Sequence, residues 1–197
     1  MTQVNKPAQT SAPILELIQN RWSPRVFDTT FEISPQQITS LGEAFRWAPS
    51  SSNQQPWRVV FLTRNAELFQ QVSERGLTGF NQTWAPTASL YAVILGRQFE
   101  QGEKRNQAAT YYDLGLASMQ LVLQAESMGL RSHFMGGILA EPIAQILGIS
   151  EHWVVCVIAV GKQGSIDGVS EELMKRETAE RSRLAPESVY LINQRLS

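Results

Sequence analysis

Two clusters of arginine residues, far apart in the chain, have the composition of an anion-binding site. The first is the segment RWSPR at residues 21–25, and the second is RSR at residues 181–183. A guanidinium group can donate two parallel hydrogen bonds to one phosphate, so two converging clusters could hold a phosphate between them. The alternative is that both are solvated surface arginines, which is the common situation for such pairs.

A loop of hydrogen-bonding side chains lies between these clusters, at residues 49–57 (PSSSNQQPW). Its serine, asparagine and glutamine side chains suit a ligand that presents hydroxyl, carbonyl and N–H groups. The alternative is an ordinary turn, because serine, asparagine and proline are typical turn residues.

Other familiar sites have no support in the sequence. No G-x-G-x-x-G motif follows a strand, and neither a Walker sequence nor a G-x-S-x-G elbow is present. His133 and His152 lack the spacing and carboxylate partners of a metal site, so no metal is expected. Cys156 stands in an apolar run and is expected to be an inert core residue. The net charge of -1 argues against a nucleic-acid partner and against an anionic membrane surface.

The bulk composition predicts one globular domain over residues 1–197. Apolar residues make up 43% of the 197 residues and charged residues 18%, which is ordinary for such a domain. The polar stretch 1–12 is expected to be a flexible N-terminal arm, and it lacks the apolar core of a secretion signal. The apolar run 153–160 is too short to span a bilayer. These features predict a cytoplasmic protein without a membrane contact.

Helix and strand signals alternate along the chain, which predicts a layered α/β or α+β domain. Ser34, Pro35 and Gln37 form a capping-box pattern that starts a helix ending near Ala48. Helices are also expected at 13–22, 65–75, 106–128, 141–147 and 170–178, and strands at 57–63, 90–95, 154–160 and 188–192.

The helix expected at 106–128 carries apolar or small residues on nearly every side. Such a helix must be covered on every side, and a chain of this length has little material with which to cover it alone. It is therefore expected to lie at a dimer interface. A central core helix inside a monomer is the alternative.

Taken in order, these segments resemble the nitroreductase family. The segment 21–28 (RWSPRVFD) is similar to the family's opening motif, and 48–60 (APSSSNQQPWRVV) is similar to its Pro-Ser-Ser-x-Asn-x-Gln-Pro-Trp loop. Phe80-Asn81 and Met135-Gly136-Gly137 resemble later family segments, and 181–184 (RSRL) resembles the closing basic pair.

The resemblance implies an α+β fold with a central mixed, largely antiparallel sheet flanked by helices, and a long central helix at a homodimer interface. It implies FMN as the cofactor and NADH or NADPH as co-substrate. The implied FMN-binding residues are Arg21, Trp22, Ser23, Arg25, Pro49, Ser50, Ser51, Asn53, Asn81, Met135, Gly136, Gly137, Arg181 and Arg183.

Within that set the resemblance implies distinct roles. Arg21, Arg181 and Arg183 would hold the phosphate, with Ser23 nearby. Arg25 and Asn81 would contact the pyrimidine edge of the flavin, and the Gly136 backbone N–H would face its reactive N5. Ser50, Ser51 and Asn53 would come from the partner subunit. No side chain is implied as a catalytic acid or base.

The implied activity is ping-pong reduction of nitroaromatic, quinone or related electron-poor acceptors at the expense of NAD(P)H. Alternatives are a specialised flavin enzyme of the same fold (a dehalogenase, a flavin-fragmenting enzyme or an azoline dehydrogenase), a non-enzymatic FMN carrier, or a nucleic-acid or partner-binding module. Only residues 96–107 bridge a region where many members carry a longer substrate lid, and Gly136 stands where some carry glutamate.

Overall fold

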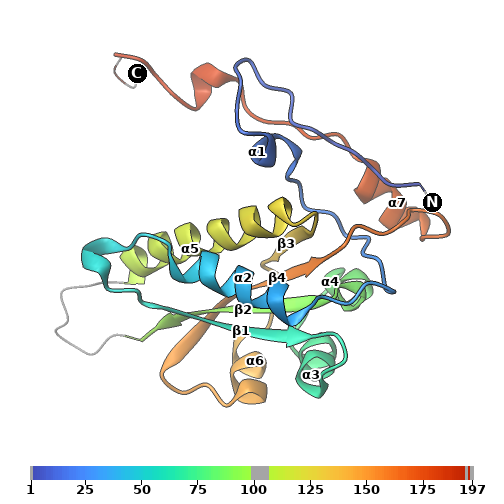
Figure 1. The fold of residues 1–197 in the computed structure, drawn as a ribbon, viewed down its shortest axis with the longest axis vertical. Helices are drawn as coiled ribbons and strands as arrows, with labels where there is room; N and C mark the ends of the chain where they lie inside the picture. The colour runs from blue at the N-terminus through green and yellow to red at the C-terminus, as the bar shows by residue number, and fades with distance from the viewer. Residues whose placement is uncertain (1, 99–106, 194, 196–197) are drawn as a thin grey trace.

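The computed structural model describes residues 2–98, 107–193 and 195. Its centre is an antiparallel sheet with the strand order β1-β2-β4-β3 (Figure 1). The strands are β1 (Trp57–Thr63), β2 (Leu90–Arg97), β3 (Arg131–Met135) and β4 (His152–Gly161). The α+β class is confirmed, and every strand pairing in the described residues is antiparallel.

Helices cover both faces of the sheet. They are α1 (Glu16–Asn20), α2 (Pro35–Arg46), α3 (Glu67–Arg75), α4 (Asn81–Trp84), α5 (Gln107–Ser127), α6 (Ala140–Leu147) and α7 (Glu171–Thr178). The predicted capping box at the start of α2 is present, since the Ser34 hydroxyl accepts from the Gln37 N–H and the Gln37 side chain accepts from the Ser34 N–H.

Successive side chains of β2 point to opposite faces of the sheet, so the core consists of two clusters. Leu90, Ala92 and Ile94 face a cluster built with α2 and α5. Tyr91, Val93 and Leu95 face a cluster built with α3, α4 and α6. Because both faces are buried, β2 is apolar along almost its whole length.

Some elements differ from the sequence prediction. Strand β3 was not predicted, because its residues RSHFM mix polar and apolar types. The strand expected at 188–192 is wrong, because this stretch follows a 3-10 turn (Pro186–Ser188) and pairs with no strand of the described chain. The first helix is shorter than the predicted span 13–22. Residues 99–106 of the short bridge expected between 96 and 107 lie outside the described residues.

The N-terminal arm lies along the C-terminal part of the chain (Figure 1). The Thr2 N–H donates to the Ser165 hydroxyl over 3.0 Å, and the Gln163 side chain donates to the Val4 carbonyl over 2.6 Å. Further along, the Ala8 N–H donates to the Gln19 carbonyl at the end of α1. The flexibility expected for residues 1–12 stays a prediction.

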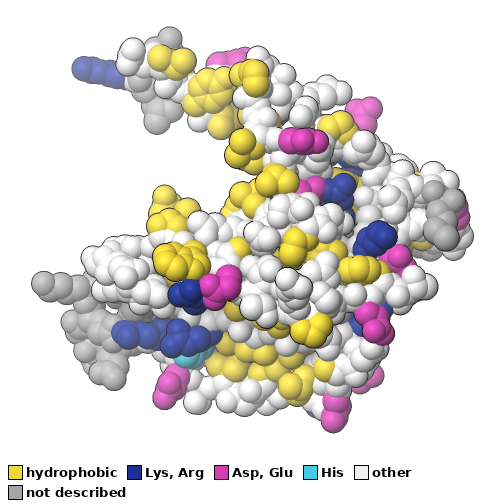
Figure 2. All heavy atoms as spheres, in the orientation of Figure 1, with side chains coloured by type: hydrophobic (Ala, Val, Ile, Leu, Met, Phe, Trp, Pro, Cys, Tyr) yellow, Lys and Arg dark blue, Asp and Glu magenta, His cyan; other side chains and the backbone are white. Residues whose placement is uncertain are grey.

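Two apolar surfaces are left uncovered. Along α5, Tyr112, Leu116, Met119 and Leu123 form a half-buried to exposed stripe at helical spacing, which we call the α5 stripe. The segment around α1 and the segment after residue 182 project from the body and carry exposed apolar residues, with a wide hollow between them and the body (Figure 1 and Figure 2). These residues are Ile14, Leu15, Leu17, Ile18, Leu184, Val189, Tyr190, Leu191 and Ile192. No described helix has the length and apolar character needed to cross a membrane.

Candidate functional site

The two arginine clusters converge in the fold. Burial lowers the pKa of Arg21, and the nearby charges of Arg181 and Arg183 lower it further. Arg21 also donates to the Ser23 hydroxyl over 3.4 Å. Within the described part of the chain, none of the three guanidinium groups pairs with a carboxylate. Three cations are therefore held together without a counter-charge, which favours an anionic ligand.

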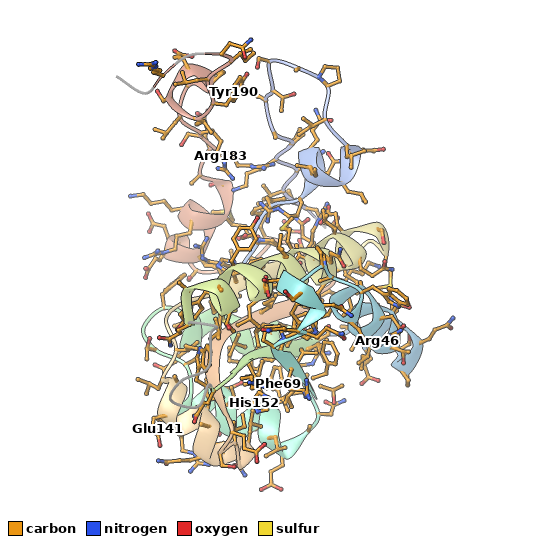
Figure 3. The ribbon with its side chains drawn as sticks, turned by 90° about the vertical axis from the view of Figure 1, so that its left-hand side faces the viewer. Arg46, Phe69, Glu141, His152, Arg183 and Tyr190 are labelled. Atoms are coloured by element: carbon orange, nitrogen blue, oxygen red, sulfur yellow. The ribbon has the colours of Figure 1, made fainter. Side chains whose placement is uncertain are left out.

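The two C-terminal arginines are held differently. The Arg181 guanidinium donates to the backbone carbonyls of Lys6 and Gln19, so it also ties the two ends of the chain together. Arg183 is exposed and donates to the adjacent Ser182 carbonyl over 2.7 Å. Figure 3 shows Arg183 on the segment that rises from α7 towards the C-terminus, near the level of α1. Removal of the Arg183 side chain should therefore disturb the fold less than removal of the Arg181 side chain.

The segment between Arg21 and Arg25 is largely built into the core. Trp22 is buried, and the Lys6 ammonium lies 4.1 Å from the centre of a Trp22 ring. The Arg25 side chain is half-buried, which lowers its pKa, while the neighbouring Glu177 raises it. A ligand contact from Trp22 would have to come from its backbone, whereas Arg25 retains an accessible side chain.

Asn81 and the glycine pair after β3 meet at one point. The Asn81 side-chain amide donates to the Gly137 carbonyl over 3.1 Å, and the Thr78 N–H donates to the same carbonyl over 3.0 Å. Gly136 is exposed, and a Cβ there would meet no atom within 4 Å. Met135 is the buried last residue of β3 rather than part of the loop.

Arg176 joins this point to the arginine-rich segment. Its guanidinium lies 4.2 Å from the centre of the Phe80 ring, beside Asn81, and its charge lowers the pKa of Arg25. Arg176 therefore lies close both to Phe80, the neighbour of Asn81, and to Arg25.

The polar loop at 49–53 has an unusual backbone. Ser52 and Asn53 have φ angles of 51° and 53°, and Gln55 has 48°. Non-glycine residues rarely adopt this left-handed region, and such residues cluster at ligand-binding sites. The loop is held by the Gln55 N–H, which donates to the Ser50 hydroxyl, and by the Ser51 N–H, which donates to Asp113 on α5.

Within one chain this loop does not reach the arginines. It leads into Trp57, which pairs with Gly96 at one end of the sheet. The segment that carries Arg25 continues to Phe27, which bridges to Gln163 beyond the other end of β4. The structure thus separates Pro49, Ser50, Ser51 and Asn53 from the remaining predicted ligands.

Sequence reasoning missed three residues around the arginine segment. Glu177 accepts hydrogen bonds from the backbone of the arginine segment, and the His133 Nδ1 lies 2.9 Å from the Pro24 carbonyl. Lys6 donates to the Glu177 carbonyl. No pattern in the sequence pairs Glu177 with a distant residue, so its role becomes visible only when its burial is known. No group of side chains fit to hold a metal ion occurs in the described residues.

The structure thus combines a layered α+β fold with a cationic cluster and an asparagine–glycine contact, and the cluster favours an anionic ligand. The model of the nitroreductase family matches residues 18–87 and 70–162, which together span more than half of the chain. The protein therefore belongs to the nitroreductase family, as its motifs indicated.

Known proteins agree with this assignment. The chain is 25% identical over 184 residues to an oxygen-insensitive NADPH nitroreductase of Helicobacter pylori, covering 75% of this chain and 86% of that protein. A solved structure described as an oxidoreductase containing FMN is 32% identical and superposes with a TM-score of 0.85 over 98% of both chains. An FMN-dependent nitroreductase of Clostridium difficile, at 19% identity, shares the fold with a TM-score of 0.67 over 90% of this chain and 98% of that one.

Proposed function

We propose that this protein is an FMN-dependent oxidoreductase that uses NADH or NADPH to reduce nitroaromatic, quinone or related electron-poor acceptors in a ping-pong reaction. One observation carries the proposal: Arg21, Arg181 and Arg183 come together with no carboxylate partner among the described residues. Arg176 lies close both to Arg25 and to Phe80, the neighbour of Asn81. The relatives named for NADPH and FMN support the choice of cofactor and reductant.

The donor set fits FMN part by part. The guanidinium groups of Arg21, Arg181 and Arg183, with the Ser23 hydroxyl, would hold the phosphate. Arg25 and Asn81 would contact the pyrimidine edge of the ring system, and Gly136 would offer its N–H from an open stretch of backbone. When bound, the flavin supplies the hydride chemistry, and the chain supplies position and charge.

We further propose that the site is completed by a second copy of the chain. The loop 49–53 lies beside the first part of α5, through Asp113, while β3 and the glycine pair follow the end of α5. A two-fold axis that crosses α5 at right angles would place the start of one α5 near the end of the other. The α5 stripe supplies an apolar contact for that arrangement, and the same partner would cover the projecting segments around α1 and after residue 182. A cytoplasmic location stays a prediction.

The decisive experiment is the absorption spectrum of the purified protein after incubation with FMN, followed by addition of NADPH under nitrogen. We expect stoichiometric FMN that is released by denaturation, rapid bleaching, and recovery of the colour when a nitroaromatic or a quinone is added. Protein that binds FAD instead, or no flavin, would contradict the proposal. Slow bleaching would favour a carrier, and bleaching without turnover of these acceptors would favour a specialised flavin enzyme.

The phosphate contact is tested by Arg183→Ala. Because Arg183 makes only a local hydrogen bond within the described chain, its loss should weaken FMN binding by about 1.5–3 kcal/mol, the range for hydrogen bonds to a charged group, without unfolding the protein. Arg75→Ala, an exposed arginine on α3, is the matched control and should leave the FMN dissociation constant unchanged. Equal FMN affinities for wild type and Arg183→Ala would show that Arg183 is a solvated surface arginine without a contact to FMN.

A further inference from the structure

The last turn of α7 places a carboxylate inside the protein. Glu177 is fully buried, although glutamate is seldom buried without a partner. Its Oε2 accepts a hydrogen bond from the Arg25 N–H over 2.8 Å, and its Oε1 accepts one from the Val26 N–H over 3.4 Å. The carboxylate therefore binds the backbone from which the Arg25 side chain projects.

Two cations, Lys6 and Arg25, act on this carboxylate. Burial raises the pKa of Glu177, while the two N–H groups and the charges of Lys6 and Arg25 oppose that rise. Lys6 itself is fixed, because its ammonium donates to the Glu177 and Ala179 carbonyls over 2.7 and 2.9 Å and lies over Trp22. A charged carboxylate in this position has hydrogen-bond donors on both oxygens, as a buried charge requires.

Other contacts limit how the segment can move. The Val26 carbonyl accepts a hydrogen bond from the Gly164 N–H, and the Pro24 carbonyl lies 2.9 Å from the His133 Nδ1. On either side of Arg25 the carbonyls are thus held by the body of the protein. The N–H groups of Arg25 and Val26 are held by Glu177, which makes this residue the main side-chain anchor for Arg25 itself.

We propose that Glu177 is a positioning residue for Arg25, setting where its guanidinium stands and thereby how strongly the site prefers reduced over oxidised flavin. This inference rests on the proposed function, in which Arg25 would contact the pyrimidine edge of the flavin. Reduction of a flavin adds negative charge at that edge. A cation stabilises a developing anion in proportion to how well it is preorganised, so a loosened Arg25 would lose part of that effect.

The test is the ratio of the dissociation constants for oxidised and reduced FMN, obtained from the reduction potential of free and bound flavin. For Glu177→Ala we expect reduced FMN to be disfavoured by about tenfold more than oxidised FMN, which lowers the potential by about 30 mV for a two-electron couple. Glu177→Gln retains one acceptor oxygen and the length of the side chain, so it should shift the ratio in the same direction but less. Glu177→Gln carries the test if the alanine variant does not fold.

A second measurement separates positioning from general destabilisation. In an Arg25→Met background, Glu177→Ala should cause no further change in the ratio, because two residues that act as one unit are not additive. Glu171→Ala removes an exposed carboxylate from the first turn of the same helix and should leave the ratio at the wild-type value.

The outcomes are distinct. Wild-type protein that binds no FMN contradicts the proposed function. Wild-type protein that binds FMN, together with Glu177 variants of lower thermal stability but unchanged potential, overturns this inference alone. A shift that persists in full without Arg25 also overturns it, because Glu177 would then act by another route.

Discussion

His133 lies beneath the arginine segment and is held neutral there. Burial lowers its pKa to about 4, with the charges of Arg25 and Arg21 adding to that effect. Its ring packs against Trp84 at 4.5 Å between ring centres. Because the Pro24 carbonyl can only accept a hydrogen bond, Nδ1 must carry the proton of the neutral ring.

Because His133 is buried and neutral, we expect the folded protein to lose stability in weak acid. The unfolded chain binds a proton at His133 near its ordinary pKa of 6.5, and the folded chain does so only near 4. Acidification through that window therefore favours unfolding, by up to about 3 kcal/mol at 1.36 kcal/mol per pKa unit. We expect His133→Gln to reduce the difference between urea midpoints at pH 7 and pH 4.5, and His152→Gln, at a more accessible site, to change it much less. An undiminished difference in His133→Gln would assign the acid sensitivity to other groups.

For single residues, the sequence indicated the candidate ligands but not the residues that position them. Arg21, Arg25 and Arg183 stand in motifs whose spacing is visible in the chain. Glu177 and His133 act through burial, and burial arises from contacts between segments that lie 109–152 residues apart. No local pattern contains that information.

The loop after β3 is closely packed at Gly137 but open at Gly136, and this difference can be tested. A Cβ at Gly137 would lie 2.9 Å from the Asn81 amide nitrogen and 3.1 Å from the Thr78 hydroxyl, whereas one at Gly136 would meet nothing. Gly137→Ala should displace the Asn81 side chain and weaken FMN binding roughly fivefold, which is about 1 kcal/mol and typical of one net hydrogen bond. Gly136→Ala keeps its N–H and is the matched control, expected within a factor of two of wild type by fluorescence titration. Equal effects of both substitutions would contradict the role of Asn81.

Elements with strong local signals were predicted and those without were not. The capping box fixed the start of α2, and the apolar runs identified β1, β2 and β4. Strand β3 has a mixed pattern because one strand neighbours it and buried polar residues lie within it. The apolar stretch after Pro186 was read as a strand because its composition is strand-like, yet Val189, Tyr190 and Ile192 are exposed in the single chain. Composition alone cannot distinguish a strand from an apolar segment that pairs with no strand.

At the scale of the whole molecule, the structure sharpens the test of the proposed dimer. Ala117 on α5 is fully buried within its own chain, so Ala117→Glu would disturb the core rather than an interface. Leu116 lies on the α5 stripe and is half-buried. Leu116→Arg should place an unpaired charge in the contact and separate the subunits, with loss of FMN by linkage.

Sedimentation with absorbance read at the flavin band measures both effects at once. Leu68→Arg is the matched control, because Leu68 is 39% exposed on α3, at the other face of the sheet. We expect this variant to sediment as the wild type and to retain its flavin. A folded Leu116→Arg monomer with stoichiometric FMN would show that one chain completes the site, and the shared-site model would then be wrong.

The pairing of the arm at residues 2–8 with the C-terminal part of the chain has a consequence for biosynthesis. Thr2 bonds to Ser165 and Lys6 to Glu177, across 163 and 171 residues of chain. The ribosome therefore synthesises the arm long before the segment that the arm contacts. The nascent arm has no partner while the sheet forms. Contacts of such sequence separation close late and slowly. The segment around Arg25, held by Glu177, would thus become ordered only after translation of α7, so a ribosome-stalled chain that stops before α7 should not be able to load cofactor.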